Sequence, residues 1–155
     1  MKLRLVALGA RLPAWLTEGY ADYARRLPRD FALDLIELKP EPRDRGKTVA
    51  QILAAEAARI AGVTDGYHVV ALDERGQSWT TAKLAAKLDA WRERALPVAF
   101  VIGSADGLDP EFKRNADAVL ALSALTLPHG LARIVLAEQL YRATSMLSGH
   151  PYHRE

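Results

Sequence analysis

The chain has 155 residues, of which 50% are apolar and 26% are charged, and this composition is typical of one soluble globular domain with its own core. It contains no cysteine, which excludes a disulfide framework, a thiolate nucleophile and a cysteine-based zinc site. The net charge of +2 gives only weak support for a nucleic-acid partner. The N-terminal stretch is too short for a signal peptide and no apolar run has the length of a membrane span, so we expect a cytoplasmic protein without a membrane partner.

Hydrophobic periodicity predicts strands that alternate with helices along the chain. Alternating or continuous apolar runs predict strands at residues 2–9, 31–38, 67–72, 97–102 and 117–122. Helical spacing of apolar residues predicts helices at 13–27, 48–61, 80–93 and 129–147, with a short one after Asp109-Pro110. Several strands are apolar on both faces, as in a parallel sheet that helices cover. We therefore predict a single-domain α/β fold over residues 1–155, with a parallel-rich sheet flanked by helices.

Local signals refine these boundaries. Thr48 and Gln51 have the spacing of a capping box, and Gly62 is expected to end the helix that begins there. Residues 73–79 are expected to form a polar loop. The loop at 103–107 (GSADG) predicts a tight turn with positive φ at its glycines, because it matches neither a phosphate-binding loop nor a nucleophile elbow.

Three predicted strand ends have unusual sequences: residues 72–74, 103–107 and 122–127. Ligands of open α/β sheets bind beyond the carboxyl ends of the strands, so these segments predict one pocket. Its walls would be mostly apolar with backbone amides and carbonyls, which suits a flat heteroaromatic group.

The last helix and the tail carry the remaining candidates. His129 and Arg133 are four residues apart and share a helix face, which either contacts an anionic substrate or is a solvated helix start. The tail HPYHRE either contacts phosphates or a stacked base, or is a frayed terminus. We expect no metal there, because Pro151 separates the histidines and carboxylates are scarce.

Several stretches together resemble the RlmH-type family of SPOUT-superfamily methyltransferases over the whole chain. The resemblance rests on MKLRLVALG at the start, LDERGQSW at 72–79, the IG…GL loop at 102–108, LSALTLPHGLAR at 122–133, LAEQLYRA at 136–143 and the terminal HPYHRE. It implies methyl transfer from S-adenosylmethionine to N3 of a pseudouridine in large-subunit ribosomal RNA, on the assembled ribosome. It also implies a homodimer and a C-terminal trefoil knot.

The resemblance assigns roles to individual residues. It implies that the cofactor is held by Leu72, Gly103, Leu122, Ser123, Ala124, Leu125, Thr126 and Leu127. Catalysis is expected from His129, Arg142, His153 and Arg154, with His153 or His129 as the general base, and substrate binding from Arg133 and Tyr152. Arg43, Arg45 and Lys47 are possible phosphate contacts, or are simply solvated.

One loop departs from the family pattern and keeps alternatives open. Family members often have a glycine pair after the fourth strand, where this chain has Gly103-Ser104, and Ser104 would be strained if the backbone there needs positive φ. A non-catalytic ribosome-binding or RNA-binding protein with the same fold is therefore one alternative. A SPOUT methyltransferase that acts on tRNA is the other, although the HPYHRE tail argues against it.

Overall fold

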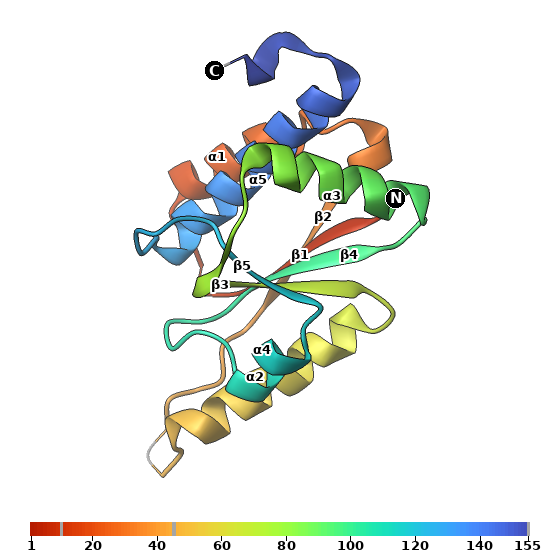
Figure 1. Ribbon diagram of the computed structural model, residues 1–155. Coiled ribbons are helices and arrows are strands. Elements are labelled where there is room, and N and C mark those ends of the chain that lie inside the picture. The colour runs from red at the N-terminus through yellow and green to blue at the C-terminus, as the bar shows by residue number, and fades with distance from the viewer. Residues whose placement is uncertain (10, 45, 155) are drawn as a thin grey trace.

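A five-stranded sheet in the order β2-β1-β4-β3-β5 forms the centre of the protein in a computed structural model that describes residues 1–9, 11–44 and 46–154 (Figure 1). Every pair of neighbouring strands is parallel. The strands are β1 (Leu3–Leu8), β2 (Leu33–Leu38), β3 (His68–Ser78), β4 (Val98–Ile102) and β5 (Ala118–Ala121). The predicted α/β class and parallel sheet are confirmed.

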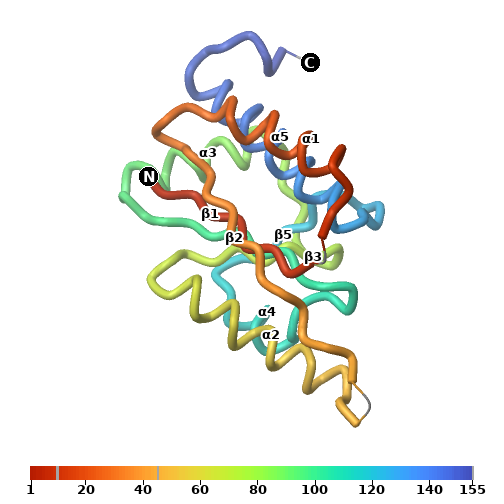
Figure 2. Tube along the Cα trace, turned by 180° about the vertical axis from the view of Figure 1, so that it is seen from behind, coloured from red at the N-terminus to blue at the C-terminus, as the bar shows by residue number. Residues whose placement is uncertain are grey.

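Helices cover both faces of this sheet (Figures 1 and 2). One face carries α1 (Ala14–Ala24), α3 (Thr81–Glu93) and α5 (His129–Ser148), and the other carries α2 (Val49–Thr64) and α4 (Pro110–Asn115). Two short 3-10 helices, η1 (Arg29–Phe31) and η2 (Pro151–His153), precede β2 and follow α5. The sheet is therefore the middle of three layers, as its apolar central strands require.

The core follows from the alternation of side chains along the central strands. Leu3 and Leu5 of β1 pack with the α1, α3 and α5 side, whereas Val6 and Leu8 pack with the α2 and α4 side. All residues of β4 are buried. Burial on both faces holds the sheet rigid and fixes the carboxyl ends of β3, β4 and β5 at one edge.

The capping signals are confirmed. The Thr48 hydroxyl accepts from the Gln51 amide while the Gln51 side chain accepts from the Thr48 amide, so α2 begins with a full capping box. Asp109 caps α4, with Pro110 in its first turn. These short-range interactions need no tertiary context, which is why the sequence alone predicts them.

Three predicted boundaries are wrong. Residues 73–78 belong to β3, which continues beyond an irregularity after Leu72 and pairs with β5. Gly62 does not end α2, which runs on to Thr64; Gly66, with φ of +79°, makes the turn that follows. Phe31 lies in η1 and not in β2. In each case a tertiary contact or a neighbouring turn outweighs the local pattern.

Candidate active site

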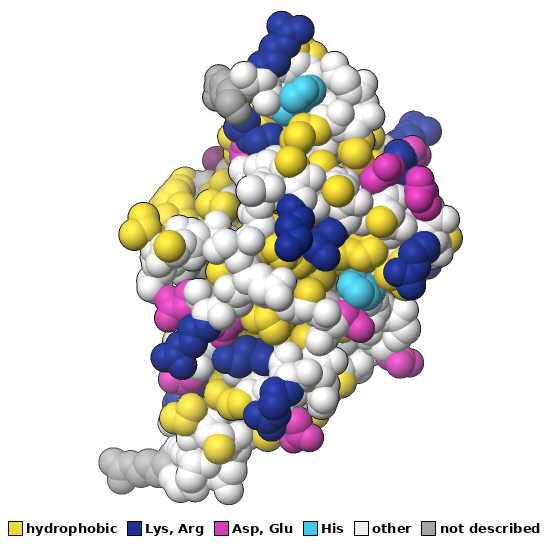
Figure 3. Space-filling model, viewed as in Figure 1, with side chains coloured by type: hydrophobic (Ala, Val, Ile, Leu, Met, Phe, Trp, Pro, Cys, Tyr) yellow, Lys and Arg dark blue, Asp and Glu magenta, His cyan; other side chains and the backbone are white. Residues whose placement is uncertain are grey.

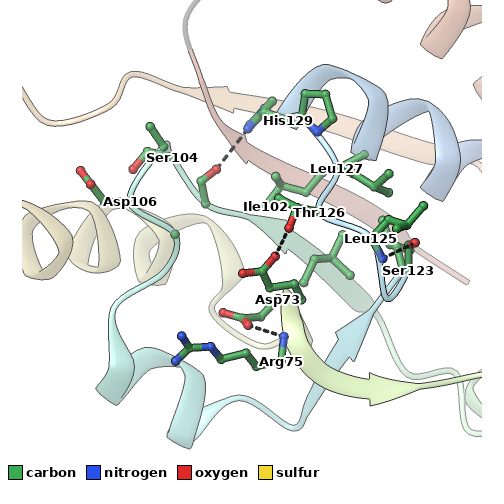
Figure 4. Close-up of a pocket in the computed structure, with 18 of the residues that line it drawn as sticks. Asp73, Arg75, Ile102, Ser104, Asp106, Ser123, Leu125, Thr126, Leu127 and His129 are labelled. Atoms are coloured by element: carbon green, nitrogen blue, oxygen red, sulfur yellow. Dashed lines mark hydrogen bonds between the residues drawn. The ribbon is translucent and has the colours of Figure 1, made fainter.

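A cavity of about 600 Å³ opens beside the irregularity of β3 and the carboxyl ends of β4 and β5 (Figure 4). Its walls come from residues 72–75, 102–107, 122–123 and 125–129, with Lys113 of α4 and Ala132 of α5. The three predicted segments do build one pocket, but the first lies within β3, which continues to Ser78, and not at its end. Since all strands are parallel, their ends meet at one edge, and this edge is the ligand side of an open α/β sheet.

The segment 122–127 forms the apolar wall of the cavity. Seven of the eight residues predicted to hold the cofactor line it, namely Leu72, Gly103, Leu122, Ser123, Leu125, Thr126 and Leu127. Ala124 is exposed and is not among the lining residues, because the chain turns outward there. Leu125 keeps 75% of its surface exposed at the cavity mouth, so an apolar ligand would cover it. Thr126 donates a hydrogen bond of 2.6 Å to Glu74, which ties this segment to the end of β3.

The GSADG loop is a tight turn, as predicted, but only one of its glycines has positive φ. Gly107 has φ of +82°, and its amide donates to the Ser104 carbonyl at 2.9 Å. Gly103 is needed for space, because a Cβ there would lie 2.4 Å from the Gly107 carbonyl oxygen. Ser104 does not have positive φ, so the strain expected at this position is absent. Its side chain reaches out of the loop toward α2, where its hydroxyl donates to Glu56 at 2.7 Å.

His129 begins α5 and connects it to this loop. Nε–H of Arg133 donates to His129 Nε2 at 2.9 Å, so Nε2 is an acceptor and the ring proton is on Nδ1. Nδ1 then donates to the Gly103 carbonyl over 3.1 Å. Burial lowers the pKa of His129 below its ordinary value, and the Arg133 charge adds to that effect. His129 is therefore neutral near pH 7, and both of its nitrogens are engaged.

Arg133 is buried and does not form a surface for an anion. It is 3% exposed and donates to Glu37 of β2 at 2.9 Å as well as to His129. Its Nη2 and the Tyr20 hydroxyl have no hydrogen-bond partner among the described residues, and burial raises the pKa of Tyr20 to about 12. The shared helix face predicted for His129 and Arg133 is correct, but in this chain it faces inward.

The end of the cavity near α4 is polar. Asp73 accepts from Lys113 Nζ and from the Arg75 amide, both at 2.8 Å. Burial tends to raise the pKa of the Asp73 carboxyl, but the hydrogen bonds from Lys113 and Arg75 hold that pKa below its ordinary range. Asp73 is thus an ionised carboxylate with a fixed orientation.

The C-terminal tail folds back on the far end of α5. The Tyr152 ring packs on Tyr141 with centroids 4.5 Å apart, and its hydroxyl donates to Glu138 at 3.3 Å. The Arg142 guanidinium binds Glu138 and lies over the Tyr152 ring, with 4.9 Å from Cζ to the ring centroid. Nδ1 of His153 lies 3.3 Å from the Ser145 hydroxyl. Residues 150–154 are therefore docked rather than frayed.

One chain does not bring the tail to the cavity. Arg142 follows His129 by 13 residues on the same helix, which at about 1.5 Å per residue is roughly 20 Å along the axis. The views from both sides place the C-terminus at the opposite end of α5 from the loop that enters it (Figures 1 and 2). Arg142, Tyr152, His153 and Arg154 are thus grouped with one another, and His129 is grouped with the cofactor loops.

Arg43 and Lys47 of the 39–47 loop make ion pairs within the chain. Arg43 binds Asp106 at 2.8 Å and Glu56 at 3.3 Å, and Lys47 binds Glu41 at 2.8 Å. Arg43 and Lys47 are thus engaged within the chain, their contact with phosphate stays a prediction, and Arg45 lies outside the described residues. Glu56 escaped the sequence reasoning, although an acid between Ile52 and Ile60 on one helix face is a detectable signal.

Among residues 1–9, 11–44 and 46–154, we find no group of three or more His, Asp or Glu side chains that could hold a metal ion. The same residues contain no helix with the length and hydropathy needed to cross a bilayer.

Comparison with known proteins agrees with this geometry. Residues 1–153 match a family model described as "Predicted SPOUT methyltransferase". The chain is 55% identical to "Ribosomal RNA large subunit methyltransferase H" of Nitrosospira multiformis over 99% of both chains, and 53% identical to the protein of the same name from Laribacter hongkongensis over the full length of both. It also resembles the fold of a probable methylase family protein from Haemophilus influenzae, with a TM-score of 0.59 and 16% identity over 97% of this chain and 69% of that one.

Proposed function

The chain belongs to the SPOUT methyltransferase family, and on that premise we propose that it transfers a methyl group from S-adenosylmethionine to N3 of a pseudouridine in large-subunit ribosomal RNA. The observation that carries the proposal is full-length identity of 53–55% to relatives named as large-subunit ribosomal RNA methyltransferases. The proposed unit is the single domain 1–155, acting on ribosomes in the cytoplasm.

The cavity fits the proposed cofactor. Leu72, Ile102 and Leu122 provide apolar contact of the kind an adenine ring needs, and Leu125 and Leu127 complete that wall. The charged lining residues are Asp73, Glu74 and Asp106 with Arg75 and Lys113, and Lys113 and Arg43 pair with Asp73 and Asp106. When bound, S-adenosylmethionine supplies an electrophilic methyl on its sulfonium. The chain's part is to hold the methyl in line with the base nitrogen, and most of the rate enhancement can come from such alignment.

N3 of the base must lose a proton, and the hydrogen bonds favour His153 over His129 as the acceptor. A general base needs a free lone pair near the proton that it takes. The lone pair of His129 accepts from Arg133, and its other nitrogen donates to Gly103. We assign His129 to positioning of the cofactor loop, and Arg142 and Arg154 to stabilising charge on the base carbonyls. Loss of turnover in His153→Ala with cofactor affinity retained supports this assignment, and full turnover contradicts it.

A homodimer would unite the two groups of residues. The tail docks near Arg142, which lies roughly 20 Å along α5 from His129 at the cavity, so a second copy has to bring Tyr152, His153 and Arg154 to it. Trp15 of α1 and Leu131 of α5 are 62% and 37% exposed on adjoining helices, which provides apolar surface for such a contact. Tyr141 of the same helix adds little to this surface, because the Tyr152 ring packs on it.

Complementation tests the shared site. A cavity variant, Leu125→Arg, and a tail variant, His153→Ala, should each be inactive as homodimers. After unfolding and refolding together, mixed dimers keep one intact pairing, so about a quarter of all sites should recover activity. Recovery of none, with mixed dimers demonstrated by mass spectrometry, contradicts a site shared between chains.

A C-terminal trefoil knot is part of the proposal. Residues 122–128 run from β5, at the sheet edge, to α5, which packs against α1 and α3. A threaded chain would therefore pass the connection from β3 to α3. A crystal structure that traces residues 76–82 and 120–130 tests the threading, and an unthreaded crossing contradicts it.

The RNA surface has to come from the folded dimer. Lys and Arg side chains are spread over the face in Figure 3 with acidic side chains between them, so no single basic stripe stands out on that face. A weak electrostatic contribution is expected, with a small salt dependence of RNA binding. A steep salt dependence would point to phosphate contacts by residues now held in intrachain ion pairs.

The decisive experiment is methyl transfer with labelled S-adenosylmethionine to ribosomes, free large-subunit RNA and bulk tRNA, with the modified nucleoside identified by mass spectrometry. N3-methylpseudouridine from large-subunit RNA supports the proposal. Label in tRNA alone favours the tRNA alternative. Absence of label and of cofactor binding favours a non-catalytic ribosome-binding protein.

A further inference from the structure

Glu56 is a buried carboxylate outside the cavity that binds Ser104, a residue of the cavity wall. It is 2% exposed on α2 and does not line the cavity. Its Oε1 accepts from the Ser104 hydroxyl at 2.7 Å, and its Oε2 accepts from the Glu41 amide at 2.8 Å and from Arg43 Nη1 at 3.3 Å. A charge at this depth is costly unless it is paired, and here both oxygens receive donors.

Arg43, which binds Glu56, also binds the 103–107 loop directly. Nη2 of Arg43 donates to Asp106 at 2.8 Å and to the Ser104 hydroxyl at 3.1 Å. Ser104 and Asp106 both line the cavity. The loop is therefore held toward α2 by Glu56 and Arg43, and toward α5 by the bond between His129 and the Gly103 carbonyl.

We propose that Glu56 is a positioning residue for the cofactor, acting through Ser104 to fix the 103–107 loop while Arg43 neutralises its charge. This inference rests on the proposed cofactor and extends it to residues that do not touch the cofactor themselves. Ser104, the departure from a glycine pair, is on this view the point at which the loop is anchored. The anchor is specific to a hydroxyl, because it both donates to Glu56 and accepts from Arg43.

The test compares variants of Ser104. Ser104→Ala removes the hydroxyl and should weaken S-adenosylmethionine binding about ten-fold, since a hydrogen bond to a buried charge is lost. The KM for the cofactor should rise equally, while kcat at saturation stays within about two-fold, because the reacting groups are intact. Ser104→Thr keeps the hydroxyl and should bind within about two-fold of the wild type.

Two further variants separate positioning from general stability. Glu56→Gln should bind S-adenosylmethionine at least as poorly as Ser104→Ala. In the wild type both carboxylate oxygens of Glu56 accept hydrogen bonds, whereas the NH2 group of glutamine would face one set of those donors with hydrogens of its own. Arg59→Ala is the matched control: Arg59 binds Glu41 and the Lys39 carbonyl in the same loop and makes no hydrogen bond to Ser104. It should leave cofactor binding unchanged even if the melting temperature falls.

The outcomes are distinct. Wild-type affinity in Ser104→Ala, or an equal loss in Arg59→Ala, overturns the inference. If Glu56→Gln does not fold, the comparison of cofactor binding between Ser104→Ala and Ser104→Thr still tests the proposal. A wild-type protein that binds the cofactor and methylates no RNA contradicts the proposed function while the binding comparison still tests Glu56. A wild-type protein that binds no cofactor contradicts both.

Discussion

Replacing Gly103 by alanine should disrupt the cavity through a steric clash of known size. The new Cβ would lie 2.4 Å from the Gly107 carbonyl oxygen, where carbon–oxygen contacts are ordinarily about 3.3 Å or longer, so the two must separate by roughly 0.9 Å. Because the same Cβ would also lie 3.0 Å from Leu108 Cγ, a shift of the Gly107 carbonyl alone does not relieve the clash. The loop has to move, and the bond from His129 has to lengthen.

The expected cost has two measurable parts. Overpacking of this kind destabilises by about 1–3 kcal/mol, and each kcal/mol lowers the melting temperature of a chain of this size by about 2–4 °C. A displaced loop should also weaken S-adenosylmethionine binding by about ten-fold or more, because the ligand contacts depend on positions held within about 0.5 Å. Thermal unfolding and isothermal titration calorimetry measure these effects separately.

Gly107→Ala provides the matched control. Its Cβ would meet nothing within 4 Å, but its φ of +82° imposes a strain of about 1–2 kcal/mol on any side chain. It should therefore lose stability to a similar extent with a smaller loss of affinity. If Gly103→Ala melts and binds cofactor like the wild type, the view that Gly103 is required for space is refuted.

Three shorter predictions follow from the backbone and from His129. Gly62→Ala should stabilise the protein by about 0.5–1 kcal/mol in urea unfolding, since the residue is helical and its Cβ enters open space; a loss of stability would contradict this. Ala95→Gly should stabilise by up to about 1 kcal/mol, because Ala95 has φ of +50°, and an unchanged midpoint would argue against strain there. The folded-state pKa of His129 is lowered, so its stabilising contribution is full above the unfolded pKa near 6.5 and declines below it, by at most about 1.4 kcal/mol per pH unit. His129→Gln should flatten this decline between about pH 7 and 5, and parallel curves for the two proteins would contradict the assignment.

The local signals of the sequence determined the elements and their order. The Thr48 capping box, the Asp109-Pro110 helix start and the fully apolar fourth strand each depend on residues within one turn or one strand. The predicted pocket also formed, because the parallel strands β4 and β5 leave their carboxyl ends at one edge, beside the irregularity of β3 after Leu72.

The errors share a physical cause, which is that the deciding partner lies far away in the sequence. Residues 73–78 are polar and read as a loop, but β5 supplies backbone partners more than 40 residues later, and Gly76 allows its close approach. Ser104 was expected to be strained by a positive φ. Its φ is not positive, and its hydroxyl binds Glu56, which precedes it by 48 residues and could not be identified from the local sequence. Arg43 was expected to contact phosphate or solvent, and the local sequence contains no sign of its bond to Asp106, 63 residues away.

The candidate catalytic residues also show which features follow from the local sequence and which depend on tertiary contacts. The sequence by itself singled out the 122–133 segment and the tail as candidates for the chemistry, one leading into the last helix and one following it. Only the tertiary structure decided that His129 and Arg133 face inward, and that the tail docks near Arg142, which lies roughly 20 Å along α5 from His129. Helical periodicity defines which residues share a face, but which face is buried depends on the sheet and on the helices packed beside it.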